Sequence, residues 1–365
     1  MICKIVTIVD WRPNYGNQLQ NYAVQKIFTE LTGVVPSTLV FEKGWDISWK
    51  GHLRYWVNRF TGFKYTKAPN YWKYDFWRAT TFAKFRKKYI ASEVIDQIPS
   101  GDSADYFILG SDQVWNPLWY QHPWKKEMFL LTFAPPEKRI CVAPSFGITA
   151  LPGEWTEWFK KNLMDFPQLA VREEDGAKII KDLTGKDAYV MIDPTLMIDA
   201  DTWEKMAEKP KNVETKRDYV LVYALGGITN TMKKNIDYFE KTQNCKIYYL
   251  LQPIDANLYK SDPGNFLYLV KHAKIVITDS FHACVFSFLL ERPFLVYERG
   301  GDEPKMGSRI STLLKTLKLE NRYVSENDVK NLEEILNVDY SEGKRIIKEK
   351  KKETIAFLKR RLMLK

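Results

Sequence analysis

One histidine of this chain stands where a predicted helix begins directly after a buried strand, in the stretch ITDSFHACVFSFLLERP. The backbone N–H groups and the dipole of such a helix start favour a bound anion. The imidazole of His282, with an ordinary pKa of about 6.5, can exchange a proton there near neutral pH. The same pattern fits a second interpretation, in which Asp279 or Ser280 caps the helix and His282 is a hydrogen-bonded core residue. Ser280, Phe281 and His282 are therefore candidates for an anion site with acid–base chemistry.

Two arginines stand at similar places. Arg172 ends a short predicted strand in LAVREEDG, and Arg309 precedes a predicted helix in GSRISTLL. A guanidinium can hold a carboxylate or a phosphate through two parallel hydrogen bonds. For Arg172, the acidic residues that follow it offer a local salt bridge as the alternative. Both arginines are candidate ligands of an anionic group.

Polar residues also follow two predicted strands in the N-terminal part of the chain. NYGNQLQ contains Gly16, Asn17 and Gln18, and GSDQVWNP contains Asp112 and Gln113. A glycine lets another group approach the backbone closely, and the amides offer hydrogen-bond donors and acceptors. Asp112 suits a general base or a residue that orients a sugar hydroxyl, but it could equally cap a short helix.

Strands and helices alternate along the chain, and each of these segments lies at the end of a strand or the start of a helix. Strands separated by helical segments predict parallel sheets with right-handed crossovers. The alternation starts a second time at YVLVYALG, residues 219–226. We therefore expect an α/β fold of two Rossmann-like domains that face each other across a cleft, with ligands beyond the carboxyl ends of the strands. The expected boundaries are 1–200, 201–340 and a C-terminal helix over 341–365.

Two segments fall outside the alternation. The residues from about 45–90 are dense in aromatic and basic side chains and predict an insertion in the first domain. The end of the chain, GKRIIKEKKKETIAFLKRRLMLK, predicts a basic amphipathic helix. Such a helix can associate with an anionic membrane, or it can pack back over the N-terminal domain with its cations in water. The sequence leaves both alternatives open.

The composition of the chain, 365 residues of which 45% are hydrophobic, suits two globular domains and excludes wholesale disorder. A net charge of +10 favours anionic partners such as phosphorylated substrates, anionic lipids or nucleic acid. A membrane-spanning apolar run and the layout of a signal peptide are both missing. The cysteines are scattered without metal-ligand spacing, so we expect reduced core thiols in a cytoplasmic protein without a zinc site. Walker, GxGxxG, HExxH and GxSxG motifs are absent, so nucleotide hydrolysis, zinc proteolysis and serine hydrolysis have no support.

In their order along the chain, several of these segments together resemble the polysaccharide pyruvyl transferase family. The resemblance extends over about residues 3–325 and rests on NYGNQLQNYAVQ, GSDQVWNP, VREEDGAKII, MIDPTLMI, ITDSFHACVFSFLLERPFLVY and GSRISTLL. It implies a fold like that of the two-domain GT-B glycosyltransferases. It also implies an enzyme that transfers pyruvate from phosphoenolpyruvate to hydroxyls of a sugar, typically as a cyclic ketal. Such a reaction requires no redox cofactor, and we expect no metal.

The resemblance implies that the position of Arg172 and the segment from Ser280 to His282 contact phosphoenolpyruvate. Many members have an arginine two residues before this histidine, where the present chain has Ser280. Arg309 or a backbone anion site could replace that cation, or the donor could differ. We assign the acid–base role to His282 and the role of a second base to Asp112, because the methylene carbon of the donor must gain a proton and a sugar hydroxyl must lose one.

The acceptor would then lie against the N-terminal domain, and the donor against the C-terminal domain. Gly16, Asn17, Gln18 and Gln113 are the residues expected to contact the acceptor, a sugar in a glycan or in a lipid-linked oligosaccharide. A lipid-linked acceptor and the basic C-terminal helix together predict a cytoplasmic enzyme that could associate peripherally with the inner face of the cell membrane.

Two other functions remain open from the sequence. A GT-B glycosyltransferase with a nucleotide-sugar donor would have similar domains and similar loops at its strand ends. A non-enzymatic protein could use the charge of +10 and the aromatic segment to bind a lipid surface or nucleic acid. The polar loops gather at strand ends rather than over one basic face, which favours an enzyme without a nucleic-acid partner.

Overall fold

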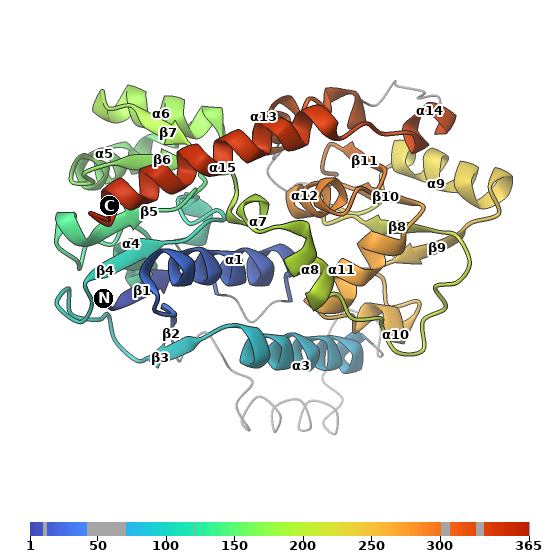
Figure 1. Cartoon of the computed structure of the whole chain (residues 1–365), viewed down its shortest axis with the longest axis horizontal. Coiled ribbons are helices and arrows are strands. Elements are labelled where there is room, and N and C mark those ends of the chain that lie inside the picture. The colour runs from blue at the N-terminus through green and yellow to red at the C-terminus, as the bar shows by residue number, and fades with distance from the viewer. Residues whose placement is uncertain (10–12, 42–70, 121, 301–306, 326–331, 365) are drawn as a thin grey trace.

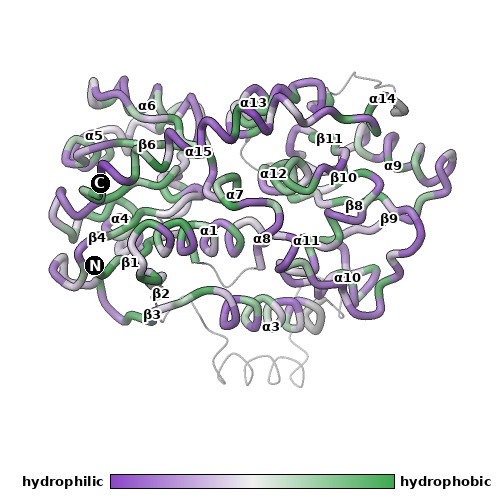
Figure 2. The backbone as a smooth tube through the Cα atoms, in the orientation of Figure 1, coloured by the Kyte–Doolittle hydropathy of each residue, from purple (hydrophilic) through white to green (hydrophobic). Residues whose placement is uncertain are grey.

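Two parallel β-sheets lie side by side in this computed structural model, each covered by helices (Figure 1). The structure describes residues 1–9, 13–41, 71–120, 122–300, 307–325 and 332–364. Hydrophobic residues follow the strands of both sheets, and the outer loops are mostly hydrophilic (Figure 2). This is the pattern expected of parallel strands, which are buried on both faces.

The first sheet belongs to the N-terminal half of the chain and has the strand order β3-β2-β1-β4-β5. Its central strands pair in parallel, with Ile5 opposite both Ile108 and Thr38. These central side chains are fully buried. The strands are β1 (Cys3–Val6), β2 (Ser37–Phe41), β3 (Ser92–Ile95), β4 (Tyr106–Leu109) and β5 (Arg139–Cys141).

The second sheet has the order β12-β11-β10-β8-β9, and its central strand β10 places Ile277 opposite both Val222 and Leu295. A separate parallel pair, β6-β7, extends the first half. The predicted α/β fold with two Rossmann-like parallel sheets is therefore confirmed. The strands are β6 (Leu169–Val171), β7 (Ala188–Val190), β8 (Tyr219–Tyr223), β9 (Lys246–Tyr249), β10 (Ile275–Thr278), β11 (Phe294–Tyr297) and β12 (Tyr323–Val324).

Each sheet has a switch point where the strand order reverses, because neighbouring strands there lead to helices on opposite faces. The reversal lies between β1 and β4 in the first sheet and between β8 and β10 in the second. The loops beyond these four strands meet in the middle of the molecule, where Gly16 of one half touches His282 of the other. Open α/β sheets bind their ligands at such points.

The helix α1 (Tyr15–Thr32) follows β1 and carries the row of amides noted in the sequence. Asn14 caps it by accepting a hydrogen bond from the backbone N–H of Asn17, and Gly33 ends it in the left-handed conformation with φ 73°. Several of the amides hold the helix on the sheet. Gln20 donates to Thr7, Gln25 donates to Thr38, and Thr38 donates to Asn21.

Further helices cover the two sheets and connect them (Figure 1). The short helices α7 and α8 lie between the halves, and α12 is buried along almost its whole length. These helices are α4 (Pro123–Phe129), α5 (Thr156–Met164), α6 (Glu174–Thr184), α7 (Pro194–Met197), α8 (Ala200–Met206), α9 (Asn230–Thr242), α10 (Ala256–Tyr259), α11 (Pro263–His272), α12 (Phe281–Leu289), α13 (Gly307–Leu317) and α14 (Leu332–Leu336).

The aromatic and basic segment predicted as an insertion lies partly outside the described residues, which leave out 42–70. Its described part includes α3 (Tyr71–Tyr89), which packs against α10 and α11 of the other half. The buried Arg78 of α3 donates to the carbonyl oxygen of Tyr259 at 2.6 Å, and Tyr259 donates to Asp75 at 2.5 Å. The helix α3 therefore links the two halves.

The basic helix at the end of the chain, α15 (Ser341–Arg361), crosses from the second half to the first (Figure 1). Near its start the ring of Tyr340 packs against Phe288, and near its end Phe357 stacks on Tyr189 at 5.3 Å. Of the two alternatives from the sequence, the structure shows the packed helix, with its apolar side covered. Across the described residues, the helices are all too short or too polar to span a membrane.

Candidate active site

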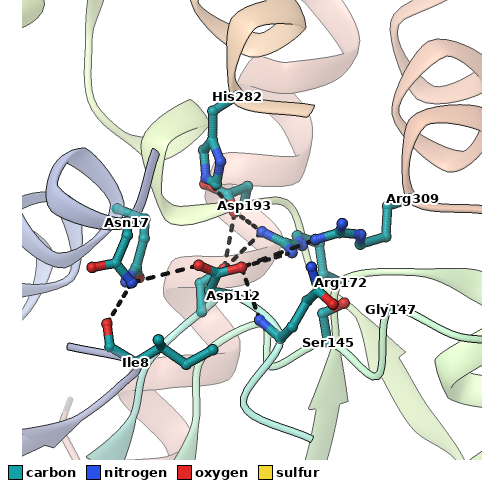
Figure 3. Close-up of polar contacts among 12 residues, drawn as sticks. Ile8, Asn17, Asp112, Ser145, Gly147, Arg172, Asp193, His282 and Arg309 are labelled. Atoms are coloured by element: carbon teal, nitrogen blue, oxygen red, sulfur yellow. Dashed lines mark hydrogen bonds and ion pairs between the residues drawn. The ribbon is translucent and has the colours of Figure 1, made fainter. Parts of the chain in front are cut away.

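The ring of His282 lies where α12 of the second half meets the start of α1. A Cβ atom on Gly16 would come within 2.0 Å of Nδ1 of this ring, so only glycine fits there. On its other side, Nε2 lies 3.8 Å from Oδ2 of Asp193, and Nε2 is buried without a hydrogen-bond partner among the described residues. The imidazole is thus held between two elements and keeps one nitrogen unused (Figure 3).

The protonation of His282 is set by opposing effects. Burial disfavours the charged imidazolium and lowers the pKa of His282. The carboxylates of Asp193 and Asp112 act in the opposite direction, and the guanidiniums of Arg172 and Arg309 add to the lowering. A neutral imidazole in the free protein, able to take up a proton when more negative charge arrives, suits a general acid.

Arg172 reaches the same place from the end of β6. Its guanidinium is almost fully buried, donates from Nη1 to Oδ2 of Asp193 at 2.8 Å, and lies 4.5 Å from the centre of the Phe281 ring. Burial opposes its charge, but Asp193, Asp112 and Glu173 outweigh burial and raise the pKa of Arg172. Nη2 has no hydrogen-bond partner among the described residues and lies 3.8 Å from Asp112. This buried cation keeps donors available for a ligand.

The sequence did not single out Asp193, which the structure places at the centre of the cluster. Asp193 is the N-cap of α7, and its side chain is fully buried. Burial disfavours its ionised form, but at the acidic pH where Asp193 titrates, the protonated imidazole of His282 and the guanidinium of Arg172 outweigh burial and lower the pKa of Asp193 to about 2. Asp193 is the aspartate of MIDPTLMI, one of the segments that carry the family resemblance, but the sequence assigned no role to this residue.

Asp112 lies opposite His282, beyond the end of β4. It has φ 81°, which is uncommon for a residue other than glycine and is typical of strained positions at functional sites. Its carboxylate is 15% exposed, the most open of the cluster, and lies 3.8 Å from Arg172 and 4.0 Å from Arg309. An open carboxylate next to two arginines can accept a proton, or it can move aside for an anion.

Arg309 approaches from the first turn of α13. Its side chain is 6% exposed, and burial together with repulsion from Arg172 lowers the pKa of Arg309 to about 9. A guanidinium in such a position gains from any additional negative charge nearby. Arg309 is therefore well placed to respond to an anionic ligand.

Ser280 caps α12 without a side-chain hydrogen bond to the helix, and its backbone N–H donates to Thr278 at 3.0 Å. The preceding Asp279 accepts from the backbone N–H groups of Leu225 and Gly226, both at 2.7 Å. This carboxylate joins the ends of β8 and β10. A third arginine missed by the sequence analysis, Arg299, lies 3.9 Å from Asp279 with its side chain 10% exposed.

Of the side chains predicted to bind an acceptor, Asn17 borders the charged cluster, whereas Gln113 and Gln18 have other surroundings. Asn17 donates to the carbonyl oxygen of Ile8, and its Nδ2 lies 3.5 Å from Asp112, so it borders the cluster (Figure 3). Gln113 instead accepts a hydrogen bond from Asn116 at 2.8 Å and packs against Gly147. Gln18 is buried, and its Oε1 has no partner among the described residues.

Together these side chains form a compact set of charges from both halves: Asp112, Arg172 and Asp193 from the first, and His282 and Arg309 from the second (Figure 3). A small hollow lined by Arg172, Asp193 and Phe281 reaches the cluster from the side of α13 and α15. Within the described ranges, His, Cys, Asp and Glu side chains form no group of three that could hold a metal ion. The arrangement can bind an anion and transfer protons beside it.

Comparison with known proteins identifies a family. The profile of the family described as polysaccharide pyruvyl transferase matches residues 14–301 of the chain. No curated protein matches the sequence significantly.

Solved structures resemble the chain over its whole length but only loosely. A glycosyltransferase from Rickettsia africae ESF-5 is 10% identical, with 99% of this chain and 98% of that chain covered and a TM-score of 0.47. A UDP-GlcNAc 2-epimerase from Neisseria meningitidis, bound to UDP-GlcNAc, is 12% identical, with 98% and 99% covered and a TM-score of 0.46. A putative UDP-N-acetylglucosamine 2-epimerase from Listeria monocytogenes is 10% identical, with 98% and 96% covered and a TM-score of 0.46.

Proposed function

Because the chain belongs to the polysaccharide pyruvyl transferase family, we propose that it transfers pyruvate from phosphoenolpyruvate to two hydroxyls of a sugar and forms a cyclic ketal. The observation that carries the proposal is the meeting of His282 and Arg172, from different halves, at the single carboxylate of Asp193. A proton-transfer group and a cation then face one space, as a doubly negative donor requires.

The chemistry assigns a role to each group. A proton from His282 is added to the methylene carbon of the donor, which makes the neighbouring carbon electrophilic. A sugar hydroxyl attacks that carbon and loses its proton to Asp112. The bond from this carbon to the phosphate oxygen breaks, and phosphate leaves with the proton that Asp112 has taken up. The second hydroxyl then closes the ring and gives its proton to the neutral His282, so both groups return to their starting states. Proton transfer by a positioned side chain contributes about 100- to 10,000-fold, so the arginines must supply much of the remaining stabilisation.

Donor binding is assigned to the cations around His282. Arg172, Arg309 and the start of α12 at Ser280 and Phe281 would hold the carboxylate and the phosphate. In this chain Ser280 stands where many family members have an arginine, so this position offers no guanidinium. We propose that Arg309, supported by Arg299, provides the missing cation for the donor. The depressed pKa of Arg309 supports this assignment, because a bound anion would relieve the repulsion that the residue experiences from Arg172.

We assign the acceptor to the first half, residues 1–200, and the donor to the second half, residues 201–340, with Arg172 as the donor contact that the first half contributes. Gly16, Asn17 and Asp112 border the space beside His282 from the first half. Gln18 and Gln113 are weaker candidates, since Gln113 is engaged with Asn116. The acceptor is a sugar of a glycan or of a lipid-linked oligosaccharide.

We further propose that the protein works in the cytoplasm, with at most an electrostatic contact to an anionic membrane. The apolar side of α15 is packed against the protein, so only exposed cations such as Lys348 and Lys352 could face lipid headgroups. Flotation with phosphatidylserine vesicles would compare the wild type with a Lys348→Glu/Lys352→Glu variant. Equal partitioning of the two proteins would end the membrane proposal.

The function itself is tested by incubation with phosphoenolpyruvate and a panel of sugar acceptors. The expected result is release of phosphate together with an acceptor that is heavier by one pyruvyl ketal in mass spectrometry. His282→Gln and Arg172→Met are expected to abolish both products, whereas Lys352→Ala on the surface is expected to retain them. Release of a nucleotide from a nucleotide sugar, without any product from phosphoenolpyruvate, would instead identify a glycosyltransferase.

A further inference from the structure

The two carboxylate oxygens of Asp193 have separate tasks. Oδ1 accepts from the backbone N–H of Thr195 at 2.9 Å and from its hydroxyl at 2.6 Å. These bonds start α7, which begins with Pro194 and packs against α1 and α12. One oxygen therefore anchors the carboxylate to the helix that lies between the halves.

Oδ2 points toward the candidate active site. It accepts from Nη1 of Arg172 at 2.8 Å and from the hydroxyl of Ser111 at 2.9 Å, and it lies 3.8 Å from Nε2 of His282. Ser111 also lies 3.4 Å from Arg172, so it helps to fix the guanidinium. A carboxylate anchored through one oxygen can orient two functional groups through the other.

We propose that Asp193 is the positioning residue of this site: it aligns Arg172 and the imidazole of His282, which come from different halves, and its negative charge keeps that imidazole able to take up a proton. This inference rests on the proposed function in one respect: that function says where the proton of His282 goes, namely to the methylene carbon of the donor. Nε2 of His282 lies 3.8 Å from Oδ2 of Asp193, so the protonated imidazole would need to move only slightly to donate a hydrogen bond to this oxygen. The arrangement follows the general logic in which a base is oriented by a third, buried group.

The charged groups around His282 support the proposed effect of Asp193 on the protonation of this imidazole. The groups that face the imidazole are Asp193 before α7, Arg172 after β6, Asp112 after β4 and Arg309 on α13, while α1 contributes the uncharged Gly16. The two arginines disfavour a protonated imidazole, as does burial. Asp193 contributes more than Asp112 to the opposing effect. Without it, burial and two cations would act against protonation with only the partly exposed Asp112 to oppose them.

The inference is tested by an NMR titration of the histidine ring protons in the free protein. The chain has four histidines, and the resonance of His282 is identified by its loss in His282→Gln. In Asp193→Asn, which retains the shape and removes the charge, the titration midpoint of His282 is expected to fall by about one pH unit or more. A midpoint that vanishes below the acid unfolding of the variant would also support the inference.

The matched control is Thr195→Val, which removes a hydrogen bond from the anchoring oxygen and leaves the charge in place. It is expected to lower stability while the midpoint of His282 stays at its wild-type value. The inference is overturned if Asp193→Asn leaves the midpoint unchanged, if Thr195→Val shifts it equally, or if the wild-type imidazole stays neutral down to acid unfolding.

Kinetics provide a second, independent measurement. In Asp193→Asn the kcat for pyruvate transfer is expected to fall about 100-fold, with its pH optimum displaced to lower pH. Because the titration needs neither donor nor acceptor, failure of the inference and failure of the proposed function are distinguishable. A shifted midpoint in a protein without transferase activity would refute the function alone, and an unchanged midpoint in an active enzyme would refute the positioning role alone.

Discussion

At the scale of single residues, the buried imidazole of His282 depends on its surroundings for its proton. In the free protein burial lowers its pKa below the ordinary value of about 6.5. The phosphate and carboxylate of a bound donor would add negative charge and favour the imidazolium. The residue can therefore change its charge on substrate binding, which is the behaviour required of a general acid.

This behaviour predicts the pH dependence of the reaction. An acid must hold its proton, so kcat/KM should fall as pH rises through the lowered pKa of His282 in the free protein. The corresponding fall in kcat should lie at higher pH, because the bound donor stabilises the imidazolium. Phosphate release, measured from about pH 5 to 8 at saturating acceptor, gives both profiles. If His282→Gln instead kept activity and showed the same fall, the titrating group would be the donor itself.

Gly16 allows a second prediction at this scale. In Gly16→Ala the new Cβ would approach the ring of His282 to 2.0 Å at Nδ1 and 2.4 Å at Cγ, so the ring must move. We expect kcat to fall about 100-fold. The free energy of unfolding is expected to fall by about 1–3 kcal/mol, because overpacking of this buried site outweighs the better helix propensity of alanine.

Steady-state kinetics and thermal unfolding test the substitution together. The matched control is Gly153→Ala, because a Cβ at Gly153 would meet nothing within 4 Å. Wild-type kcat in Gly16→Ala would show that the position of the imidazole does not matter for the reaction.

At the scale of elements, the switch points of the two sheets explain why loops so distant in the chain converge. Residues beyond β1 and β4 of one sheet meet residues beyond β8 and β10 of the other. In each pair the two strands lead to helices on opposite faces of the sheet, which leaves space beyond the strand ends. The helix α3 stabilises this arrangement from one side. Its Arg78 donates to carbonyl oxygens of the second half and lies over the rings of Tyr15 and Tyr259.

The link through α3 predicts a clear difference between two of its residues. Arg78→Met leaves buried carbonyl oxygens without a donor, so we expect a loss of roughly 2–3 kcal/mol in the free energy of unfolding. Lys88→Met on the same helix removes an exposed ion pair with Glu208 and should change stability little. Urea unfolding of both variants provides the measurement. Equal effects of the two substitutions would contradict a buried link.

At the scale of the whole molecule, one hydrophobic cluster runs through both halves. Tyr15 of α1 stacks on Phe266 of α11 at 4.6 Å, and Trp203 of α8 meets Phe286 of α12 at 5.1 Å. The helix α15 adds to this continuity by packing along both halves. The site therefore lies between halves that share a core.

The final helix supplies the prediction for this scale. Leu358 of α15 is fully buried, so Leu358→Ala should cost roughly 2–5 kcal/mol of unfolding free energy. Lys352→Ala on the exposed side of the helix is the control, with an unchanged thermal midpoint expected. Differential scanning calorimetry compares both with the wild type. A stable Leu358→Ala protein would indicate that α15 is not part of the common core.

The elements that the sequence predicted best are those with a strong local pattern. A continuous apolar run followed by a capping residue predicts a strand over residues 274–278 and a helix over residues 281–290, and both elements lie within a residue of these bounds in the structure. The strands β2 and β3 were not expected. β3, with its alternating exposure, is a short edge strand, and the long segment between β2 and β3 concealed their pairing.

The family, the α/β fold and the approximate positions of His282, Arg172, Asp112 and Arg309 at element ends could all be predicted from the amino-acid sequence, because strand ends and helix starts follow from local periodicity and capping. The convergence of these residues on Asp193, the turn of Gln113 toward Asn116 and the packing of α15 on the protein became visible in the folded molecule alone. A capping aspartate looks the same in the sequence whether its second oxygen faces water or an arginine from a distant strand. Its partners depend on how two sheets, folded from separate parts of the chain, come to lie beside each other.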